Sequence, residues 1–285
     1  MLGLKYKIAD KLVLNKFRAA LGGKVRACSS GGSALSKEVG SFFCGIGITI
    51  IEGYGLTETS PVMTVGHSDF FKFGTVGKAI PGVEVKIQPD GEIVCRGHNV
   101  MMGYYKNEEA TNEAIIDGWF HSGDIGEFDE DGLLRITDRK KSLIVTSGGK
   151  NVAPQPMEVS LTSKKYIEQC NIVGDDRNFI SALIVPSKEN LLGWAEEQGL
   201  ASLDYNALCA HDQTYEHYDA IVKTVMTNFS RYESVRKFTL IADEWTVDNG
   251  ELTPKMSIKR KVVIEKHKAE IENMYNSKDL PKVAN

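Results

Sequence analysis

The ten residues 52–61, Glu-Gly-Tyr-Gly-Leu-Thr-Glu-Thr-Ser-Pro, combine the side chains of this sequence that are best suited to chemistry. They overlap the end of an apolar, β-branched segment that reads as a buried strand. Gly53 and Gly55 would let a ligand approach the backbone closely. The hydroxyl of Thr57 is suited to a phosphate oxygen, and the carboxylate of Glu58 is a ligand that Mg²⁺ prefers. A lone Gly-x-Gly is usually an ordinary turn, but the whole string favours a ligand-binding loop.

Two further stretches are candidates for the same site. Gly31-Gly32-Ser33 follows a short predicted strand at 25–28, so this loop should lie beside the first one and help to sandwich a flat ring. Asp124, at the end of Gly-Trp-Phe-His-Ser-Gly-Asp, is suited to accept hydrogen bonds from a ribose diol. Considered alone, Asp124 is equally consistent with an aspartate that stabilises a turn and binds no ligand.

Two later stretches are basic. Residues 147–151 contain Gly-Gly-Lys, but the glycine and hydroxyl spacing of a P-loop is absent, so that reading is rejected. Residues 252–261, Leu-Thr-Pro-Lys-Met-Ser-Ile-Lys-Arg-Lys, form a basic loop suited to a phosphate or a carboxylate. The commoner reason for such a charge run is a solvated helix flank.

Composition limits the class of protein. The chain has 285 residues, of which 42% are hydrophobic and 25% charged, as in a soluble globular protein of about two domains. A formal net charge of −4 disfavours a nucleic-acid partner. No apolar run approaches the ~20 residues of a membrane span. The start lacks the layout of a signal peptide, and the five cysteines have no metal-binding spacing. We expect a cytoplasmic protein with reduced cysteines.

The elements around these stretches change in character along the chain. Strands alternate with helices up to residue 73, which predicts a parallel sheet. Alternating strands flank Pro89-Asp90-Gly91 and residues 129–132, which predicts antiparallel hairpins. Strands and helices are mixed after the polar residues 139–142. We therefore expect an α/β fold with α+β in three parts: the end of a parallel-sheet large lobe (1–73), a small antiparallel β subdomain (74–140) and a smaller C-terminal α+β lobe (141–285).

The individual elements follow from periodicity and turn residues. The sequence predicts helices at 5–21, 36–45, 187–198, 214–229 and 260–276, and strands at 25–28, 48–54, 83–88, 92–96, 125–128, 133–137, 170–173, 181–185 and 237–241. The last helix is expected to turn five side chains inward: Val263, Ile264, His267, Ile271 and Met274.

The sequence resembles the adenylate-forming acyl-CoA synthetase family over about residues 1–276. The resemblance is carried by four stretches that follow one another in the family order: residues 54–61, Gly123-Asp124, residues 138–141 and the late lysine-rich loop. The long-chain fatty-acid–CoA ligase branch is the most similar. The resemblance implies two steps, in which a fatty-acid carboxylate attacks the α-phosphate of Mg·ATP and the thiol of coenzyme A then displaces AMP. The implied substrates and cofactors are a long-chain fatty acid, ATP, Mg²⁺ and coenzyme A.

The resemblance also implies residue roles. Gly31, Gly32 and Tyr54 would flank the adenine, Thr57 would hold an α-phosphate oxygen, and Asp124 would bind both ribose hydroxyls with help from Arg139. The implied nucleotide-binding set is Gly31, Gly32, Ser33, Gly53, Tyr54, Gly55, Thr57, Asp124 and Arg139.

The remaining implied roles concern the metal, the hinge and the thiol step. Glu58 would bind Mg²⁺. Lys141 would be the hinge about which the C-terminal lobe rotates between the two steps. Gly148 and Gly149 would line the pantetheine channel.

This sequence departs from the family pattern in two ways. The phosphate loop that ends in Lys-Gly, and most of the lobe that forms the fatty-acid tunnel, should precede residue 1, so the chain resembles the C-terminal portion of a longer enzyme without its N-terminal half. We expect it to form no acyl-adenylate by itself at a useful rate.

The second departure is at Ser257, which stands where the adenylation lysine is expected. Lys259, or otherwise Lys255, is the candidate to supply the missing charge. The alternatives are a non-catalytic nucleotide-binding fragment, a fatty acyl-AMP ligase and an aryl-CoA ligase.

Overall fold

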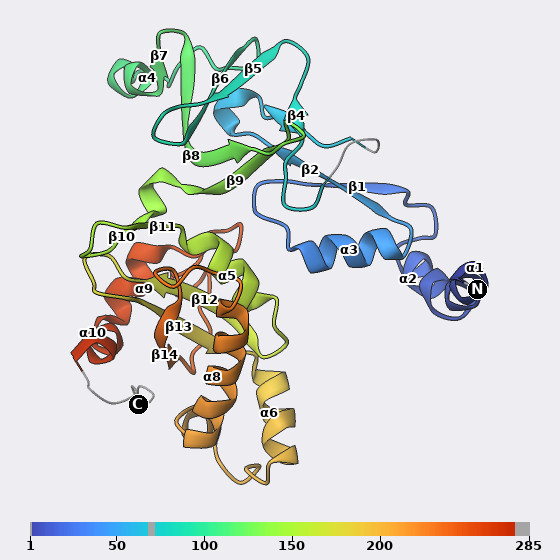
Figure 1. The fold of residues 1–285 in the computed structure, drawn as a ribbon, viewed down its shortest axis with the longest axis vertical. Helices are drawn as coiled ribbons and strands as arrows, with labels where there is room; N and C mark the ends of the chain where they lie inside the picture. Colours follow the sequence, from blue (N-terminus) through green and yellow to red (C-terminus); the bar gives the residue numbers. More distant parts are fainter. Residues whose placement is uncertain (1, 68–71, 277–285) are drawn as a thin grey trace. The chain divides into compact units, whose positions relative to one another are not determined.

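The computed structural model describes residues 2–67 and 72–276 and is drawn in Figure 1. The chain divides into two compact units, Met1–Lys141 and Ser142–Asn285. The first unit carries a mixed four-stranded sheet and a five-stranded antiparallel sheet. The second carries a three-stranded mixed sheet and a small hairpin. This is the predicted combination of α/β and α+β parts.

The chain begins with one continuous helical stretch, as the sequence predicts. It consists of α1 (Leu2–Ala9), a π-helical segment (Asp10–Leu14) and α2 (Asn15–Ala20). Arg18 braces it by donating to Asp10 Oδ1 at 2.6 Å and to the carbonyl of Ile46 at 2.7 Å. Glycines 22 and 23 follow, both with positive φ, and end the helix.

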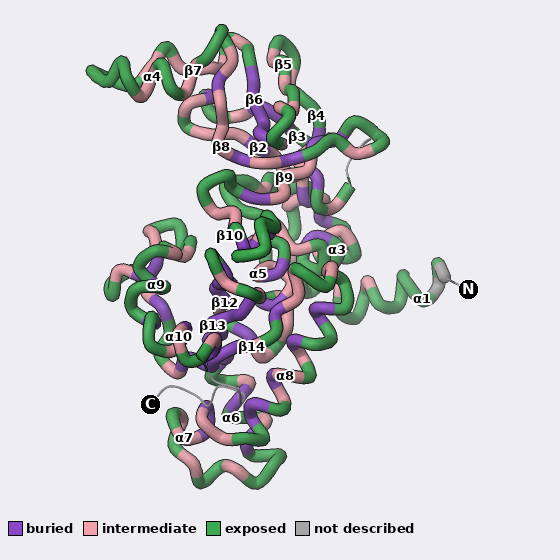
Figure 2. The backbone as a smooth tube through the Cα atoms, turned by 60° about the vertical axis from the view of Figure 1, so that its left-hand side comes forward, coloured by how far each residue is buried: buried purple, intermediate pink, exposed green. Residues whose placement is uncertain are grey.

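Most of this helical stretch is exposed, as the green tube of α1 in Figure 2 shows, and its exposed residues include an apolar face. Six of its apolar and aromatic side chains are 46–60% exposed: Tyr6, Ile8, Leu12, Val13, Phe17 and Leu21. Phe17 meets Phe42 of the neighbouring helix edge to face at 5.4 Å, and Phe42 is itself exposed. Exposed apolar surface of this kind promotes association.

We therefore predict that the isolated chain self-associates at micromolar concentration. Light scattering should give a mass above 31.4 kDa that rises with protein concentration. The double substitution Leu12→Glu and Phe17→Glu should shift the population toward monomer. A matched pair, Lys11→Glu and Lys16→Glu, changes the same helix without removing apolar area and should leave the association unchanged. A wild-type mass that stays monomeric over a hundredfold concentration range would contradict the prediction.

The four-stranded sheet of the first unit has the order β1-β2-β3-β4. Its strands are β1 (Ala27–Ser30), β2 (Thr49–Tyr54), β3 (Thr64–Val65) and β4 (Lys78–Ala79). β1 and β2 are parallel, with Ser30 opposite Glu52, and α3 (Lys37–Gly45) connects them. Ser36 caps α3 by accepting from the amide of Val39 at 3.1 Å. β1 begins two residues later than predicted, and Val25, which precedes it, packs against the cluster of Ile46, Ile48 and Ile50.

The antiparallel sheet has the order β5-β6-β8-β7, with β9 also paired to β8. Its strands are β5 (Val83–Ile87), β6 (Glu92–Gly97), β7 (Ile115–Ile116), β8 (Trp119–Phe128) and β9 (Leu134–Arg139), and α4 (Glu108–Ala114) precedes β7. Both predicted hairpins are present. Tyr54 and Met63 pack with Ile93, Phe120 and Leu134 in one core, so the end of β2 is anchored against the antiparallel sheet.

The second unit is built on the sheet β12-β13-β14, in which β12 and β13 are antiparallel and β13 and β14 parallel. Its strands are β10 (Ile144–Val145), β11 (Asn151–Val152), β12 (Ile167–Val173), β13 (Ile180–Pro186) and β14 (Val235–Leu240). Its helices are α5 (Pro154–Thr162), α6 (Lys188–Glu197), α7 (Tyr205–Cys209), α8 (Asp212–Met226), α9 (Arg260–Lys266) and α10 (Lys268–Asn276). The sequence reading missed α5 and α7.

The prediction of one helix over 260–276 was wrong in two respects. His267 breaks the helix into α9 and α10, with φ −105° and ψ 29°. Ile264, expected to point inward, is 40% exposed. Val263 and His267 occupy the inward stripe of α9, four residues apart, and Ile264 lies about 100° around the helix from Val263. Ile271 and Met274 are buried as predicted.

His267 makes the second unit sensitive to acid. Its Nε2 accepts the indole N–H of the buried Trp245 at 3.2 Å, which requires a neutral ring. Burial lowers the pKa of His267 below its ordinary value of 6.5, Lys266 lowers it further, and Glu270 and Glu251 oppose the shift. In the unfolded chain the ring takes up a proton near pH 6.5, so the free energy of unfolding should fall as the pH drops below that value.

Urea denaturation between pH 7.5 and 5.0 tests this prediction. The midpoint should stay level down to about pH 6.5 and then fall. His267→Gln keeps an acceptor for Trp245 and should reduce the fall in the urea midpoint between pH 6.5 and 5.0. The remainder is expected from His217, whose pKa is also lowered by burial. A midpoint that does not change between pH 6.5 and 5.0 would contradict the assignment.

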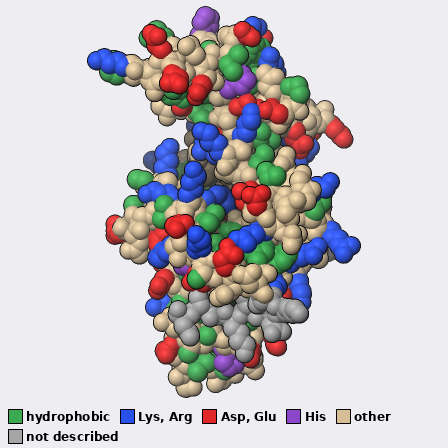
Figure 3. Space-filling model, turned by 90° about the vertical axis from the view of Figure 1, so that its left-hand side faces the viewer, with side chains coloured by type: hydrophobic (Ala, Val, Ile, Leu, Met, Phe, Trp, Pro, Cys, Tyr) green, Lys and Arg blue, Asp and Glu red, His purple; other side chains and the backbone are tan. Residues whose placement is uncertain are grey.

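Charged side chains of both signs are interspersed on the face drawn in Figure 3. Among the described residues, no helix has the length and the apolar character needed to cross a membrane.

Candidate functional site

The glycine-rich loop that follows β1 lies against the end of β2. A Cβ added at Gly31 would lie 3.1 Å from the carbonyl oxygen of Gly53, so the two backbones are as close as glycine allows. Gly32 adopts φ +81°, which also favours glycine. Ser33 is exposed in the same loop. The parallel pairing of β1 and β2 therefore brings the two predicted loops to one edge of the sheet.

Gly55 sets the shape of the turn that follows β2. A Cβ at this position would stand 1.7 Å from the carbonyl oxygen of Pro61, so the chain folds back directly over Gly55. A 3₁₀ turn (Thr57–Thr59) lies between them. The buried Thr59 holds it closed, because its hydroxyl accepts the amide of Leu56 at 2.9 Å. Residues 57 and 58 are thereby presented on a fixed turn.

Tyr54, Asp124 and Arg139 form a cluster that joins three strands. The hydroxyl of Tyr54 donates to Asp124 Oδ2 at 2.7 Å, across 70 residues of sequence, and Arg139 Nε donates to Asp124 Oδ1 at 3.0 Å. Asp124 is 5% exposed, whereas the Arg139 side chain is 66% exposed. Burial, followed by the charge of Asp124, raises the pKa of Tyr54 well above its ordinary value, so this hydroxyl stays protonated and remains a donor.

Thr57 and Glu58 lie at the surface of this region. Thr57 is exposed and Glu58 is half-buried. The hydroxyl of Tyr104 donates to Glu58 Oε1 at 2.9 Å, and the amide of Met101 donates to the Glu58 carbonyl at 2.8 Å. The described residues contain no group of three or more metal-ligating side chains. One carboxylate on an ordered turn suits Mg²⁺. This ion usually keeps several water ligands and is bound by one or two protein carboxylates together with the phosphates of a substrate.

The candidate residues of the thiol step lie in the β10–β11 hairpin of the second unit. Gly149 adopts φ +71°, and its amide donates to the carbonyl of Thr146 at 2.8 Å. Gly148 has no heavy atom closer than 4.0 Å to an added Cβ, so the space beside it is open. Lys141 is exposed in a short 3₁₀ turn (Lys140–Ser142), at the point where the chain divides into its two units.

The basic loop between Leu252 and Ile258 is a tight, closed turn. Leu252 and Ile258 pair as an isolated bridge, and the amide of Thr253 donates to the Ser257 carbonyl at 2.8 Å. The amide of Lys259 donates to the carbonyl of Glu251 at 2.7 Å. The three candidate side chains of this region, Lys255, Ser257 and Lys259, are all exposed. Lys255 lies within the turn, and Lys259 at the start of α9.

The sequence reading missed several residues that hold the candidate side chains in place. Tyr104 contacts Glu58, and Ser122 accepts the amide of Asp124 at 3.1 Å. Glu92 accepts the amide of Gly123 at 2.9 Å. Only the polar Glu92 at the head of an otherwise apolar segment gave a signal, because a charged residue there needs partners when it is buried.

Sequence comparison identifies related proteins over nearly the whole chain. The profile of the family described as AMP-binding enzyme matches residues 4–105, and that of the AMP-binding enzyme C-terminal domain matches residues 141–279. The long-chain-fatty-acid–CoA ligase FadD15 of Mycobacterium tuberculosis is 46% identical over 277 residues, 97% of this chain and 46% of the relative. The peroxisomal long chain acyl-CoA synthetase 6 of Arabidopsis thaliana is 37% identical over 292 residues, 94% of this chain and 41% of the relative. The chain thus spans about half the length of these relatives.

Solved structures share the fold at low sequence identity. The adenylation domain of a carboxylate reductase from Mycobacterium chelonae superposes with a TM-score of 0.75 at 21% identity, over 95% of this chain and 42% of that one. The O-succinylbenzoate coenzyme A synthetase of Bacillus subtilis, solved with AMP, gives a TM-score of 0.63 at 21% identity, over 95% of this chain and 51% of that one. Both family profiles, the relatives and the shared fold lead to one assignment: the chain belongs to the AMP-binding enzyme family of adenylate-forming proteins.

Proposed function

We propose that this chain is part of an AMP-forming long-chain fatty-acid–CoA ligase. The cluster of Tyr54, Asp124 and Arg139 carries the proposal, because it holds a buried carboxylate beside two glycine loops. A carboxylate fixed by a tyrosine and an arginine is suited to a ribose diol. The names of the relatives support a fatty acid and coenzyme A as the other substrates. Because the chain spans about half of their length, full turnover requires residues that correspond to the rest of those proteins.

In this proposal, AMP or ATP lies against the two glycine loops. Gly31, Gly32 and Tyr54 flank the adenine, and Ser33, Gly53 and Gly55 shape the surrounding backbone. Asp124 binds the ribose with Arg139 beside it, and Thr57 holds an α-phosphate oxygen. Catalysis of adenylyl transfer from ATP to a carboxylate, with pyrophosphate as the leaving group, depends on such positioning and on charge neutralisation.

Glu58 is the residue that would hold Mg²⁺, and Tyr104 would orient its carboxylate. When bound there, the ion would neutralise phosphate charge. The chain's own part is to keep Glu58 on the turn closed by Thr59.

The remaining assignments concern the C-terminal lobe. We propose that the chain comprises the end of the large lobe (1–73), its β subdomain (74–140) and the small lobe (141–285), with Lys141 as the hinge. Gly148 and Gly149 would line the path of the coenzyme A thiol, where the open space beside Gly148 supports the assignment. A cytoplasmic location fits five free cysteines, three of which are buried.

Lys255 and Lys259 are the proposed replacements for the adenylation lysine. In a full-length enzyme that carries this loop, Lys259→Ala should slow fatty-acid-dependent pyrophosphate release about 100-fold. It should change thioester formation from supplied acyl-adenylate by less than threefold. Lys255→Ala is the matched comparison and is expected to have the smaller effect. If neither variant separates the two half-reactions, this loop does not provide the charge.

A second candidate function is nucleotide binding without catalysis. The exposed Ser257 at the expected lysine position favours it. Both candidates require AMP to bind at Asp124, and only the ligase requires a lysine of this loop. Calorimetric titration of the chain with AMP and with 2′,3′-dideoxy-AMP tests the shared site. AMP should bind about 100-fold more tightly, because it alone offers hydroxyls to Asp124. Equal affinities would overturn the proposed site.

A further inference from the structure

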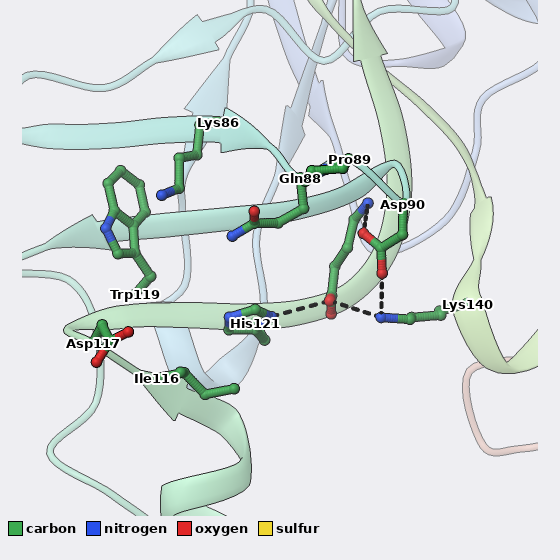
Figure 4. A pocket seen from close by; sticks show the side chains of 10 residues that line it. Lys86, Gln88, Pro89, Asp90, Ile116, Asp117, Trp119, His121 and Lys140 are labelled. Atoms are coloured by element: carbon green, nitrogen blue, oxygen red, sulfur yellow. Dashed lines mark hydrogen bonds and ion pairs between the residues drawn. The ribbon is translucent and has the colours of Figure 1, made fainter.

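The carboxylate of Glu92, at the head of β6, is contacted from three directions. Its side chain is 7% exposed. Oε1 accepts the amide of Gly123 at 2.9 Å. Oε2 accepts Lys140 Nζ at 3.0 Å and lies 3.0 Å from Nδ1 of His121 (Figure 4). Lys140 also donates to Asp90 Oδ2 at 2.7 Å. Charge-assisted hydrogen bonds of this kind are the strongest that side chains make.

Glu92 provides a hydrogen-bond acceptor for the amide of Gly123 at an irregularity of the sheet. The pairing of β6 with β8 shifts register between Glu92 and Val94. Here Gly123 adopts φ +71° and gives its amide to Glu92, and the amide of Asp124 goes to the Ser122 hydroxyl. Bulges re-aim side chains beside functional sites, and their backbone groups need replacement partners. Glu92 therefore supports the backbone that carries Asp124.

The contact with Lys140 supports the second partner of Asp124. Lys140 directly follows Arg139, whose Nε lies 3.0 Å from Asp124 Oδ1. Burial opposes the charge on Glu92, but the hydrogen bonds from His121, Lys140 and Gly123 outweigh it and hold the pKa of Glu92 below its usual value. The bond to Asp90, followed by that to Glu92, raises the pKa of Lys140. Both groups are thus charged at neutral pH.

The open cavity on this side of the sheet, of about 610 Å³, does not form a separate ligand site. Two of its basic groups, Lys140 and His121, already contact acids of the same wall. A third, Lys86, lies over the ring of Trp119 with Nζ 3.8 Å from the centroid. The labelled side chains in Figure 4 show this arrangement. The network of Glu92, Lys140, His121 and Asp90 instead supports the backbone of Gly123 and Asp124, through the contact of Glu92 with the Gly123 amide.

We propose that Glu92 is a positioning residue of the nucleotide site, which holds Gly123 and Lys140 so that Asp124 and Arg139 face the ribose together. This inference rests on the proposed function, in which Asp124 binds the ribose hydroxyls. A residue that merely stabilised the sheet would alter binding of every nucleotide equally. A positioning residue alters the part of the affinity that depends on the hydroxyls.

Glu92→Gln is the test variant, because glutamine retains an acceptor for Gly123 but loses the charge that attracts Lys140. In titrations of the full chain, we expect it to weaken AMP about tenfold and 2′,3′-dideoxy-AMP less than twofold. Glu84→Gln is the matched control, since Glu84 lies on the adjacent β5, is 62% exposed and pairs with Arg96. It should change neither affinity. If Glu92→Gln leaves AMP binding unchanged, or weakens both ligands equally, the inference is wrong.

A second variant keeps the test decisive if Glu92→Gln folds poorly. Lys140→Met replaces a side chain that is 47% exposed and removes it as a partner of Glu92. It should weaken AMP binding about fivefold without affecting binding of the dideoxy ligand. The double variant should bind AMP about as tightly as Glu92→Gln does, because both substitutions break the same contact between Lys140 and Glu92. Full additivity of the two effects would contradict the proposed coupling.

Asp124→Asn distinguishes a failure of this inference from a failure of the proposed nucleotide site. If Asp124→Asn also weakens AMP and 2′,3′-dideoxy-AMP equally, the proposed nucleotide site is wrong. If Asp124→Asn separates them and Glu92→Gln does not, only the role of Glu92 is refuted.

Discussion

Asp124→Asn should weaken AMP binding to this chain by about 100-fold. The substitution keeps the shape of the side chain, but the amide carries one oxygen where the carboxylate has two. It cannot accept from Tyr54, from Arg139 and from both ribose hydroxyls together. A hydrogen bond to a charged group contributes about 1.5–3 kcal/mol, so the loss of charge-assisted bonding at two hydroxyls accounts for about two powers of ten.

The ligand comparison separates this effect from damage to the fold. Binding of 2′,3′-dideoxy-AMP should change less than twofold in Asp124→Asn, because that ligand offers no hydroxyl to either side chain. Asp131→Asn is the matched control, since its side chain is 70% exposed in the same sheet region and lies 3.4 Å from Lys72. The control should bind AMP as the unaltered chain does. Undiminished AMP binding in Asp124→Asn would remove the main support for a nucleotide at this position.

Gly55→Ala should have the largest effect on stability of any single methyl added to the candidate site. The new Cβ would stand 1.7 Å from the carbonyl oxygen of Pro61 and 2.8 Å from Cα of Val62, so it meets backbone and not a movable side chain. Crowding of a packed interior costs about 1–3 kcal/mol when side chains adjust. A backbone clash cannot be relieved in that way, and we expect a loss of at least about 3 kcal/mol in the first unit.

Hydrogen exchange locates this loss. Amides of β2 and β3, which pair Gly53 with Val65, should exchange much faster in Gly55→Ala. Those of β12 and β13 should be unchanged. Gly45→Ala is the matched control, because an added Cβ at the end of α3 meets no heavy atom within 4 Å. Its stability should stay within about 0.5 kcal/mol of the unaltered chain. Unaltered exchange of β2 in Gly55→Ala would show that the turn is not closed as described.

The local elements could be predicted because their signals are local. Val83–Ile87 and Glu92–Gly97 are paired strands because apolar residues alternate around a Pro-Asp-Gly turn. α3 begins at a serine cap, and the first helical stretch ends at two glycines with positive φ. Single-residue details escaped prediction where packing decides them. His267 ends α9 in the middle of a continuous helical pattern, and α7 is too short to show a period.

The sequence alone determined the two hairpins of the antiparallel sheet, the start of α3, the two glycine loops and the family to which they belong. Turn residues, caps and apolar periods act over a few residues and do not depend on the rest of the chain. Tertiary structure decided that Tyr54 meets Asp124 across 70 residues, and that Glu92 supports Gly123 at a register shift. Those contacts depend on how β6 and β8 pair, and a register shift is a property of two strands together. It also decided that the apolar face of α1 and α2 is exposed, since a helical period identifies a face but not what covers it.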